Sequence, residues 1–293
     1  MIRQPAVAGQ FYPYSKSSLL ESIESCFLDK TYGPEKLPAS QDLNQRTIIG
    51  GISPHAGYMY SGSAAAHTYF NLFKEKTPDT VIIFGTDHVG YGRIALMKEG
   101  AWETPLGKIN IDTDVSNAIL KQSSVILDDS SAFLRSPFSH EHNIEVQLPF
   151  IQYCAGNKEV QFIPIKVSTH DFNKLEQMAK GIAEAVKNLD KDIVFVASSD
   201  MTHKEIRNSG PDLEKFKQLD KAVMDAFLEL DPEKTFKMAR KTTVCGAQTI
   251  TSLILTTKLL GGTKAEVLKY YTSHDKTGSL GYCVGYFSGI ILK

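Results

Sequence analysis

The chain has 293 residues, of which 42% are hydrophobic, and its 32 lysines and arginines nearly balance 33 aspartates and glutamates, for a net charge of -1. This composition suits a globular protein with a large core, and the balanced charge gives no reason to expect nucleic acid or an anionic membrane as a partner. The four cysteines form no CxxC pair, the start of the chain lacks an apolar signal core, and no run of about 18 apolar residues could span a membrane, so we expect a cytoplasmic protein.

Two apolar runs near the start predict strands that each end in a loop carrying a histidine. The run 47–51 precedes His55, and the run 81–85 precedes His88. An α/β sheet presents its ligand-binding residues at the carboxyl ends of its strands. The pattern therefore indicates that His55 and His88 converge on one metal ion or one substrate. The alternative is that each histidine caps a turn or packs locally.

Strands and helices alternate along the rest of the chain, which predicts a central sheet with helices on both faces. No segment has the composition of a linker, so we expect an α/β fold with one domain over residues 1–293. The spacing of apolar residues predicts strands at 93–97, 160–167, 193–197, 265–272 and 281–291, and a turn between short strands within 102–109. It predicts helices near 18–27, 112–119, 141–151, 172–188, 212–230, 231–240 and 247–259.

The helix predicted from residue 141 carries His142 and Glu145. Residues three apart on a helix share a face, so these two predict a hydrogen-bonded pair that lines or braces a pocket. A solvent-facing polar stripe opposite Ile144 and Leu148 is the alternative. Pro149 is an awkward residue inside such a helix and should kink it.

Further candidates follow the strand at 193–197 and precede the helix at 247–259. Asp200 and His203 share the loop after the strand, and a carboxylate near an imidazole fixes its tautomer and raises its pKa. The pair indicates proton transfer, although it could also cap a helix. Cys245 lies at a helix start, where free N–H groups favour a thiolate that attacks an electrophile or binds a metal. A lone cysteine can equally be a small core residue.

Six motifs occur in the order seen in the Memo family, which the chain resembles over essentially its whole length. The resemblance implies a fold like that of the class III extradiol dioxygenases, with a mixed central sheet flanked by helices. Those enzymes hold non-haem iron(II) with two histidines and a glutamate. The motifs are Pro54-His55-Ala56-Gly57-Tyr58, Gly85-Thr86-Asp87-His88, Thr104-Pro105-Leu106-Gly107, residues 141–150, Ser198-Ser199-Asp200-Met201-Thr202-His203 and Cys245-Gly246.

The resemblance implies that His55 and His88 bind a metal, with Cys245 in the place of the carboxylate, and that His203 is an acid/base group beside Asp200. Iron(II) is the metal that it implies first, while the softer thiolate also admits copper or zinc. Ring cleavage does not transfer with the fold, because function depends on the site.

Three classes of function stay open. The first is a dioxygenase-like oxidoreductase acting on a small molecule, and the second is a protein that handles iron or copper. The third is a module that binds a peptide or phosphopeptide, as the family's animal members imply. The lack of a basic cluster near the motifs argues against the phosphopeptide. The sequence specifies neither the substrate nor the oligomeric state.

Overall fold

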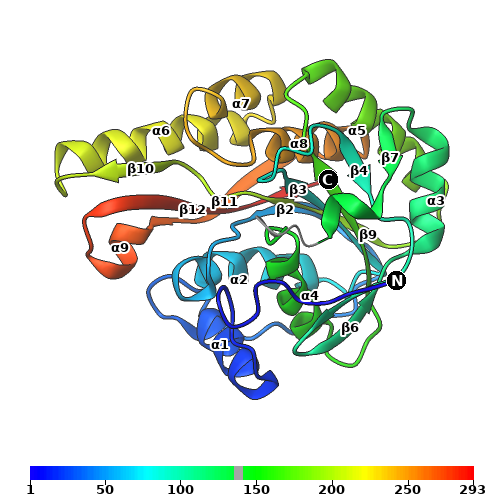
Figure 1. Cartoon of the computed structure of the whole chain (residues 1–293), viewed down its shortest axis with the longest axis horizontal. Helices are drawn as coiled ribbons and strands as arrows, with labels where there is room; N and C mark the ends of the chain where they lie inside the picture. The colour runs from blue at the N-terminus through cyan, green and yellow to red at the C-terminus, as the bar shows by residue number, and fades with distance from the viewer. Residues whose placement is uncertain (135–140) are drawn as a thin grey trace.

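The computed structural model describes residues 1–134 and 141–293, and its centre is a mixed β-sheet. The strands of the described residues in this sheet are β2 (Ile48–Ser53), β3 (Thr80–Thr86), β4 (Ile94–Leu96), β7 (Ile126–Asp128), β8 (Gln161–Val167), β9 (Ile193–Ser198), β10 (His203–Ile206), β11 (Lys264–Thr272) and β12 (Gly281–Leu292). Their order is β10-β12-β2-β9-β3-β8-β4-β7, and β11 also pairs with β12 (Figure 1). A small second sheet contains β1 (Ile2–Arg3), β5 (Ala101–Thr104) and β6 (Gly107–Asn110).

The middle of the large sheet is parallel. Strands β2, β9, β3 and β8 run in one direction, whereas β12 is antiparallel to β2 and β4 is antiparallel to β8. Nearly every residue of the four parallel strands is buried, as expected for strands covered on both faces. Because parallel strands end on the same side, the loops after β2, β9 and β3 lie next to one another. We call this side the carboxyl edge of the sheet, and the opposite side the amino edge.

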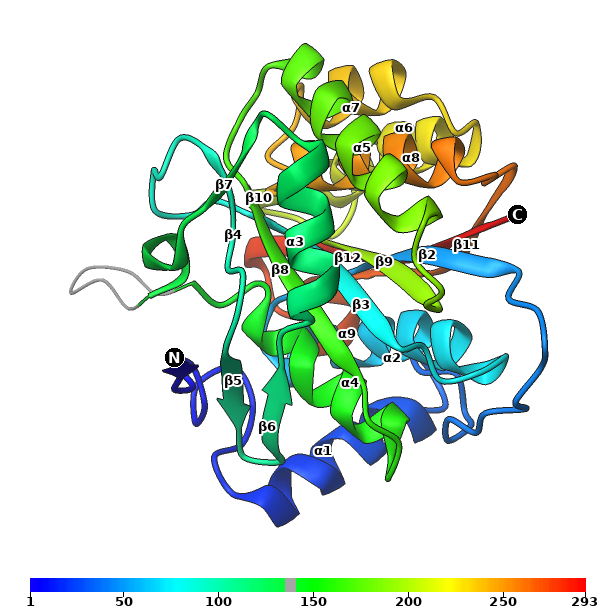
Figure 2. The same ribbon diagram turned by 90° about the vertical axis from the view of Figure 1, so that its right-hand side faces the viewer.

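Helices cover both faces of the sheet and share one continuous hydrophobic core with it (Figures 1 and 2). One face carries α3 (Thr113–Gln122), α5 (Phe172–Lys187), α6 (Pro211–Leu228), α7 (Pro232–Ala239) and α8 (Ala247–Leu259). The other face carries α1 (Lys16–Leu28), α2 (Tyr58–Lys74) and α4 (Leu148–Ala155), while α9 (Ser273–Thr277) lies between β11 and β12 in the chain. The predicted α/β fold, with a central mixed sheet and helices on both faces, is confirmed.

The helix predicted from residue 141 is wrong in its start. The chain forms a 3-10 turn at Glu145–Gln147, and α4 begins only at Leu148. Pro149 therefore lies in the first turn of α4, where its missing N–H removes no helical hydrogen bond. His142 precedes both elements, so it shares no helical face with Glu145.

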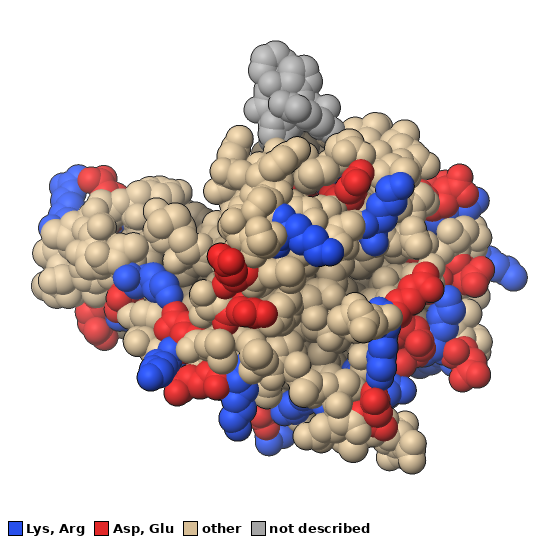
Figure 3. Space-filling view, turned by 90° about the horizontal axis from the view of Figure 1, so that it is seen from below, with Lys and Arg blue, Asp and Glu red and all other residues tan. Residues whose placement is uncertain are grey.

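The molecular surface on the side of α1 and α2 has no separate acidic and basic regions. Figure 3 shows that acidic and basic side chains are interleaved at its periphery, around a centre of mostly uncharged residues. Among the described residues, no helix combines the length and the apolar character needed to cross a bilayer.

Candidate metal-binding site

The carboxyl edge brings together most of the predicted site residues around one cavity of about 510 Å³. The short loop from β2 to α2 carries His55, and the loop after β3 carries His88. The loop from β9 to β10 carries Asp200, and His203 is the first residue of β10. His142 reaches the same cavity from the segment before α4. The three strand loops meet as the strand order predicts, because β9 lies between β2 and β3.

Hydrogen bonds to Ser198 fix the tautomer of His55. The Ser198 hydroxyl donates its single proton to the Asn143 carbonyl at 2.7 Å, and Gln147 donates to the same hydroxyl oxygen at 3.0 Å. His55 Nδ1, 2.9 Å from this oxygen, must therefore be the protonated nitrogen. The lone pair of His55 Nε2 is left facing the pocket, which is the form of imidazole that binds a metal.

Three imidazoles converge in the pocket. Each of His55, His88 and His142 offers a ring nitrogen, and the three nitrogens all lie within 4.8 Å of one another. The rings of His88 and His142 stack with centroids 4.8 Å apart, and the His55 ring stands nearly perpendicular to both. Ligand nitrogens bind zinc-sized ions at about 2.0–2.1 Å, so small side-chain movements would let these three share one ion.

The pKa values of His55 and His88 are lowered, first by burial and then by the neighbouring imidazoles. His55 is fully enclosed, whereas part of the His88 ring meets solvent, which tempers the shift at His88. Both rings are therefore neutral near pH 7, as metal ligands must be.

Cys245 lies next to His55, with its sulfur 3.2 Å from His55 Nε2. The sulfur accepts the backbone N–H of Asp200 at 3.2 Å. The thiolate expected from the helix start is opposed by the surroundings, because burial and then the Asp200 carboxylate raise the pKa of Cys245. A bound metal ion would reverse this, since a coordinating thiol is deprotonated.

Asp200 and His203 face the same pocket without a direct hydrogen bond. His203 Nδ1 lies 2.9 Å from the carbonyl oxygen of Met201 and 3.3 Å from that of Thr243, so it carries the proton and leaves Nε2 as an acceptor. Asp200 Oδ2 is 3.9 Å from this Nε2 and 4.0 Å from His55 Nε2, while Oδ1 accepts the backbone N–H of His55 at 2.8 Å. Burial raises the pKa of Asp200, and His203 opposes the rise. A water or ligand atom between the two side chains could exchange a proton with either.

Glu145 lies outside the lining of the pocket. Its carboxylate is buried and binds Arg3 together with the backbone of the N-terminal segment, so it braces the site rather than lining it. Sequence reasoning missed the aromatic walls of the pocket, which come from segments far apart in the chain. These walls are Phe11, Tyr60, Tyr282 and Tyr286.

Comparison with known proteins gives one consistent family. The profile of the family described as Memo-like protein matches residues 3–290. A MEMO1 family protein of Methanopyrus kandleri is 37% identical over 289 residues, which cover 98% of this chain and 97% of that protein. A MEMO1 family protein of Desulfurococcus amylolyticus is 39% identical over 287 residues, covering 97% of this chain and 96% of that protein.

Solved structures that resemble this chain include a weak match. The crystal structure of an uncharacterized protein from Escherichia coli K12 matches with a TM-score of 0.46 and 11% identity, over 81% of this chain and 99% of that chain. Similarity at this level carries no inference about function.

Proposed function

The chain belongs to the Memo family, and on this premise we propose that it is a metal-dependent oxidoreductase whose ion is held at the carboxyl edge by His55, His88 and a third ligand. The observation that carries the proposal is the convergence of three imidazole nitrogens within 4.8 Å of one another. The third ligand is either His142, which completes this group, or Cys245, which lies 3.2 Å from His55 Nε2. Iron(II) is the first candidate, and copper or zinc are the others, because imidazole and thiolate suit all three.

The remaining residues of the pocket fit a small molecule that contains an aromatic ring. When bound, any of these metals would polarise such a ligand, and iron or copper would also supply redox chemistry. Tyr60, Tyr282 and Phe11 would pack against the ring and exclude water. His203 Nε2 would take a proton from the ligand, and Asp200, 3.9 Å away, would stabilise the imidazolium that results.

A phosphopeptide is a poorer fit to this pocket. Among the described residues that line it there is no lysine or arginine, and Asp200 contributes a carboxylate. Phosphate recognition relies on arginine clusters. A protein that only stores iron or copper would use the same ligands, and it differs from an oxidoreductase in showing no turnover.

The test is the metal content of protein purified without oxygen, measured for the wild type and for four variants. We expect about one metal ion per chain in the wild type. His88→Ala should lower the metal affinity by more than about 100-fold, since replacing a residue that only hydrogen-bonds to a metal ligand already lowers it by roughly 10–100-fold. His142→Ala and Cys245→Ser identify the third ligand, because only the true ligand matches the loss seen for His88→Ala. His170→Ala, at an exposed histidine, is the matched control.

Oxygen consumption by the metal-loaded protein with catechols then separates an enzyme from a binding protein. Metal-dependent uptake that disappears in His203→Gln supports the oxidoreductase. Wild-type protein that holds no metal, or His88→Ala that binds as the wild type does, would reject the metal site. A full metal site without turnover would leave metal handling as the function.

A further inference from the structure

Glu145 is the centre of a buried hydrogen-bond cluster that no other part of the site explains. Its side chain and that of Arg3 are 1% and 4% exposed, and Arg3 Nη1 donates to Glu145 Oε2 at 2.6 Å. The backbone N–H groups of Ala6 and Val7 donate to the same carboxylate at 2.9–3.0 Å, and the Tyr12 hydroxyl donates at 2.7 Å. Each contact outside the 3-10 turn of Glu145 therefore leads to the N-terminal segment.

These contacts hold both ends of a tight loop, residues 7–12. Within it, Phe11 N–H donates to the Val7 carbonyl at 2.9 Å, and Gly9 N–H donates to the Tyr12 carbonyl at 2.7 Å. Glu145 binds the first and the last residue of the loop, so the position of Phe11, next to the last residue, follows from the position of the carboxylate.

Phe11 is the residue of this loop that lies against two parts of the site. Its ring packs on the His142 imidazole with centroids 4.7 Å apart and planes 38° apart. Its carbonyl accepts the N–H of Tyr58 at 2.8 Å, at the start of α2 and three residues after His55. Phe11 also lines the cavity itself.

We propose that Glu145 is a positioning residue which, through the loop 7–12, holds Phe11 against His142 and thereby sets one wall of the pocket. Loss of the carboxylate removes the acceptor of Arg3 Nη1 and of two backbone N–H groups, although Arg3 keeps the carbonyls of Phe133 and Glu141 as acceptors. The loop then loses the contact that orders it, and the His142 ring loses one of its packing partners while it keeps His88 and His55. The consequence for metal binding rests on the proposed function, whereas the placement of Phe11 does not.

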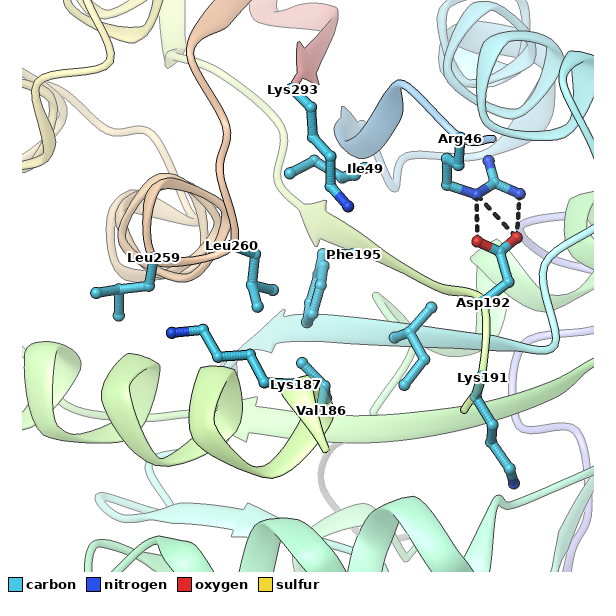
Figure 4. A pocket seen from close by; sticks show the side chains of 11 residues that line it. Arg46, Ile49, Val186, Lys187, Lys191, Asp192, Phe195, Leu259, Leu260 and Lys293 are labelled. Atoms are coloured by element: carbon cyan, nitrogen blue, oxygen red, sulfur yellow. Dashed lines mark hydrogen bonds and ion pairs between the residues drawn. The ribbon is translucent and has the colours of Figure 1, made fainter. Parts of the chain in front are cut away.

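A matched pair at the amino edge separates this role from simple stabilisation. Arg46 binds Asp192 through two nitrogens (Figure 4). The carbonyls of Leu72 and Lys76 accept from the same guanidinium. This pair has the same chemistry as Arg3 and Glu145 but lies at the other side of the sheet. Asp192→Asn is therefore the control for Glu145→Gln.

The first readout is the imidazole resonance of His142 in metal-free protein that carries labelled histidine, assigned with His142→Gln. We expect Glu145→Gln and Phe11→Ala to move this resonance in the same direction, since both remove the ring from its position over His142. Tyr12→Phe deletes one hydrogen bond to Glu145 and should move the His142 resonance less, in the same direction. This variant also tests the proposal if Glu145→Gln does not fold. Asp192→Asn should leave the resonance in place.

The second readout is Co²⁺ affinity, with Co²⁺ as a spectroscopic probe of the metal site. We expect Glu145→Gln and Phe11→Ala each to weaken binding by roughly 10–100-fold, and the double variant to be no weaker than the weaker single one, because both act through the same contact. Asp192→Asn should bind as the wild type does.

An unchanged His142 resonance in Glu145→Gln and in Tyr12→Phe overturns the proposal, as do losses of Co²⁺ affinity that multiply in the double variant. Wild-type protein that binds no Co²⁺ rejects the proposed function instead. In that case the resonance of His142 still decides whether Glu145 positions Phe11.

Discussion

The two edges of the central sheet bury polar groups in opposite ways. At the amino edge, Arg46 is paired with Asp192, and Asp112 accepts hydrogen bonds from Lys191 and Thr80. At the carboxyl edge, His55 and His203 each use Nδ1 in a hydrogen bond and present Nε2 to the pocket. Structural charges are thus neutralised by partners, while each of these two pocket histidines holds its proton on Nδ1 and its lone pair on Nε2.

The directions of the pKa shifts express the same contrast. Burial alone would raise the pKa of Asp112, but hydrogen bonds from Lys191 and Thr80 outweigh it and lower the pKa overall, so the charged form is favoured. Burial raises the pKa of Asp200 and lowers that of His55, so the neutral forms are favoured at the pocket. The fold gains stability at the amino edge, whereas at the carboxyl edge it gives up stability to keep reactive groups out of water.

The largest effect is expected for Arg46→Met at the amino edge. Removal of the guanidinium leaves Asp192 and two backbone carbonyls without their donor, and breaking a buried ion pair costs about 3–5 kcal/mol. We expect the lower end of this range, because Lys76 remains 3.7 Å from Asp192. Urea unfolding measures the loss, and metal affinity should not change.

Lys76→Met, at a more exposed partner of Asp192, is the control and should lower the free energy of unfolding by less than about 1 kcal/mol. A large drop in metal affinity for Arg46→Met would show that the two edges are coupled.

Ser198→Ala, at the carboxyl edge, should lower the metal affinity, whereas Arg46→Met should lower the stability of the fold. The variant removes the acceptor that fixes Nδ1–H of His55, and such outer partners of metal ligands contribute roughly 10–100-fold to affinity. Titration with Co²⁺ measures the change. Thr257→Val, which deletes a buried hydroxyl bonded to the Leu253 carbonyl within α8, is the control and should bind as the wild type does. Equal affinity in Ser198→Ala and the wild type would mean that the tautomer of His55 does not depend on Ser198.

Asp112→Asn and Asp200→Asn in metal-free protein should change the free energy of unfolding in opposite directions. At pH 7, Asp112→Asn should lower the free energy of unfolding by about 1.5–3 kcal/mol, the range for hydrogen bonds to charged groups. Asp200→Asn should raise it by about 0.5–2 kcal/mol, as is common when a functional residue is replaced.

The dependence on pH follows from the direction of each shift. The lowered pKa of Asp112 gives stability that is present above the unfolded-state pKa, near 3.9, and is lost as the pH falls through the folded-state value. The raised pKa of Asp200 gives a penalty that is present above its folded-state pKa and disappears as the pH falls toward 3.9. Both differences from the wild type should therefore shrink in acid, as unfolding curves from pH 7 to pH 3 would show. If both variants changed the free energy of unfolding in the same direction at pH 7, the two edges would not bury their carboxylates in opposite ways.

The sequence predicts the fold well where a local pattern decides the structure. Apolar runs place β2, β3 and β9, and the polar residues that follow them place His55, His88 and Asp200 at one edge. The prediction is wrong at residue 141, where a run with helical spacing hides a 3-10 turn, and Pro149 marks the true start of α4. Proline is favourable in the first turn of a helix, so Pro149 itself indicates that α4 begins at Leu148.

Strand order and long-range contacts decide what the local pattern leaves open. The sequence by itself determines that the strands are buried and that histidines follow two of them, because burial and turn formation depend on neighbouring residues. Only the tertiary structure brings His142 beside His88, fixes Nδ1–H of His55 through Ser198, and ties Glu145 to Arg3 across 142 residues of chain. Each of these contacts joins segments that are far apart in the chain, and no periodicity within a single segment carries that information.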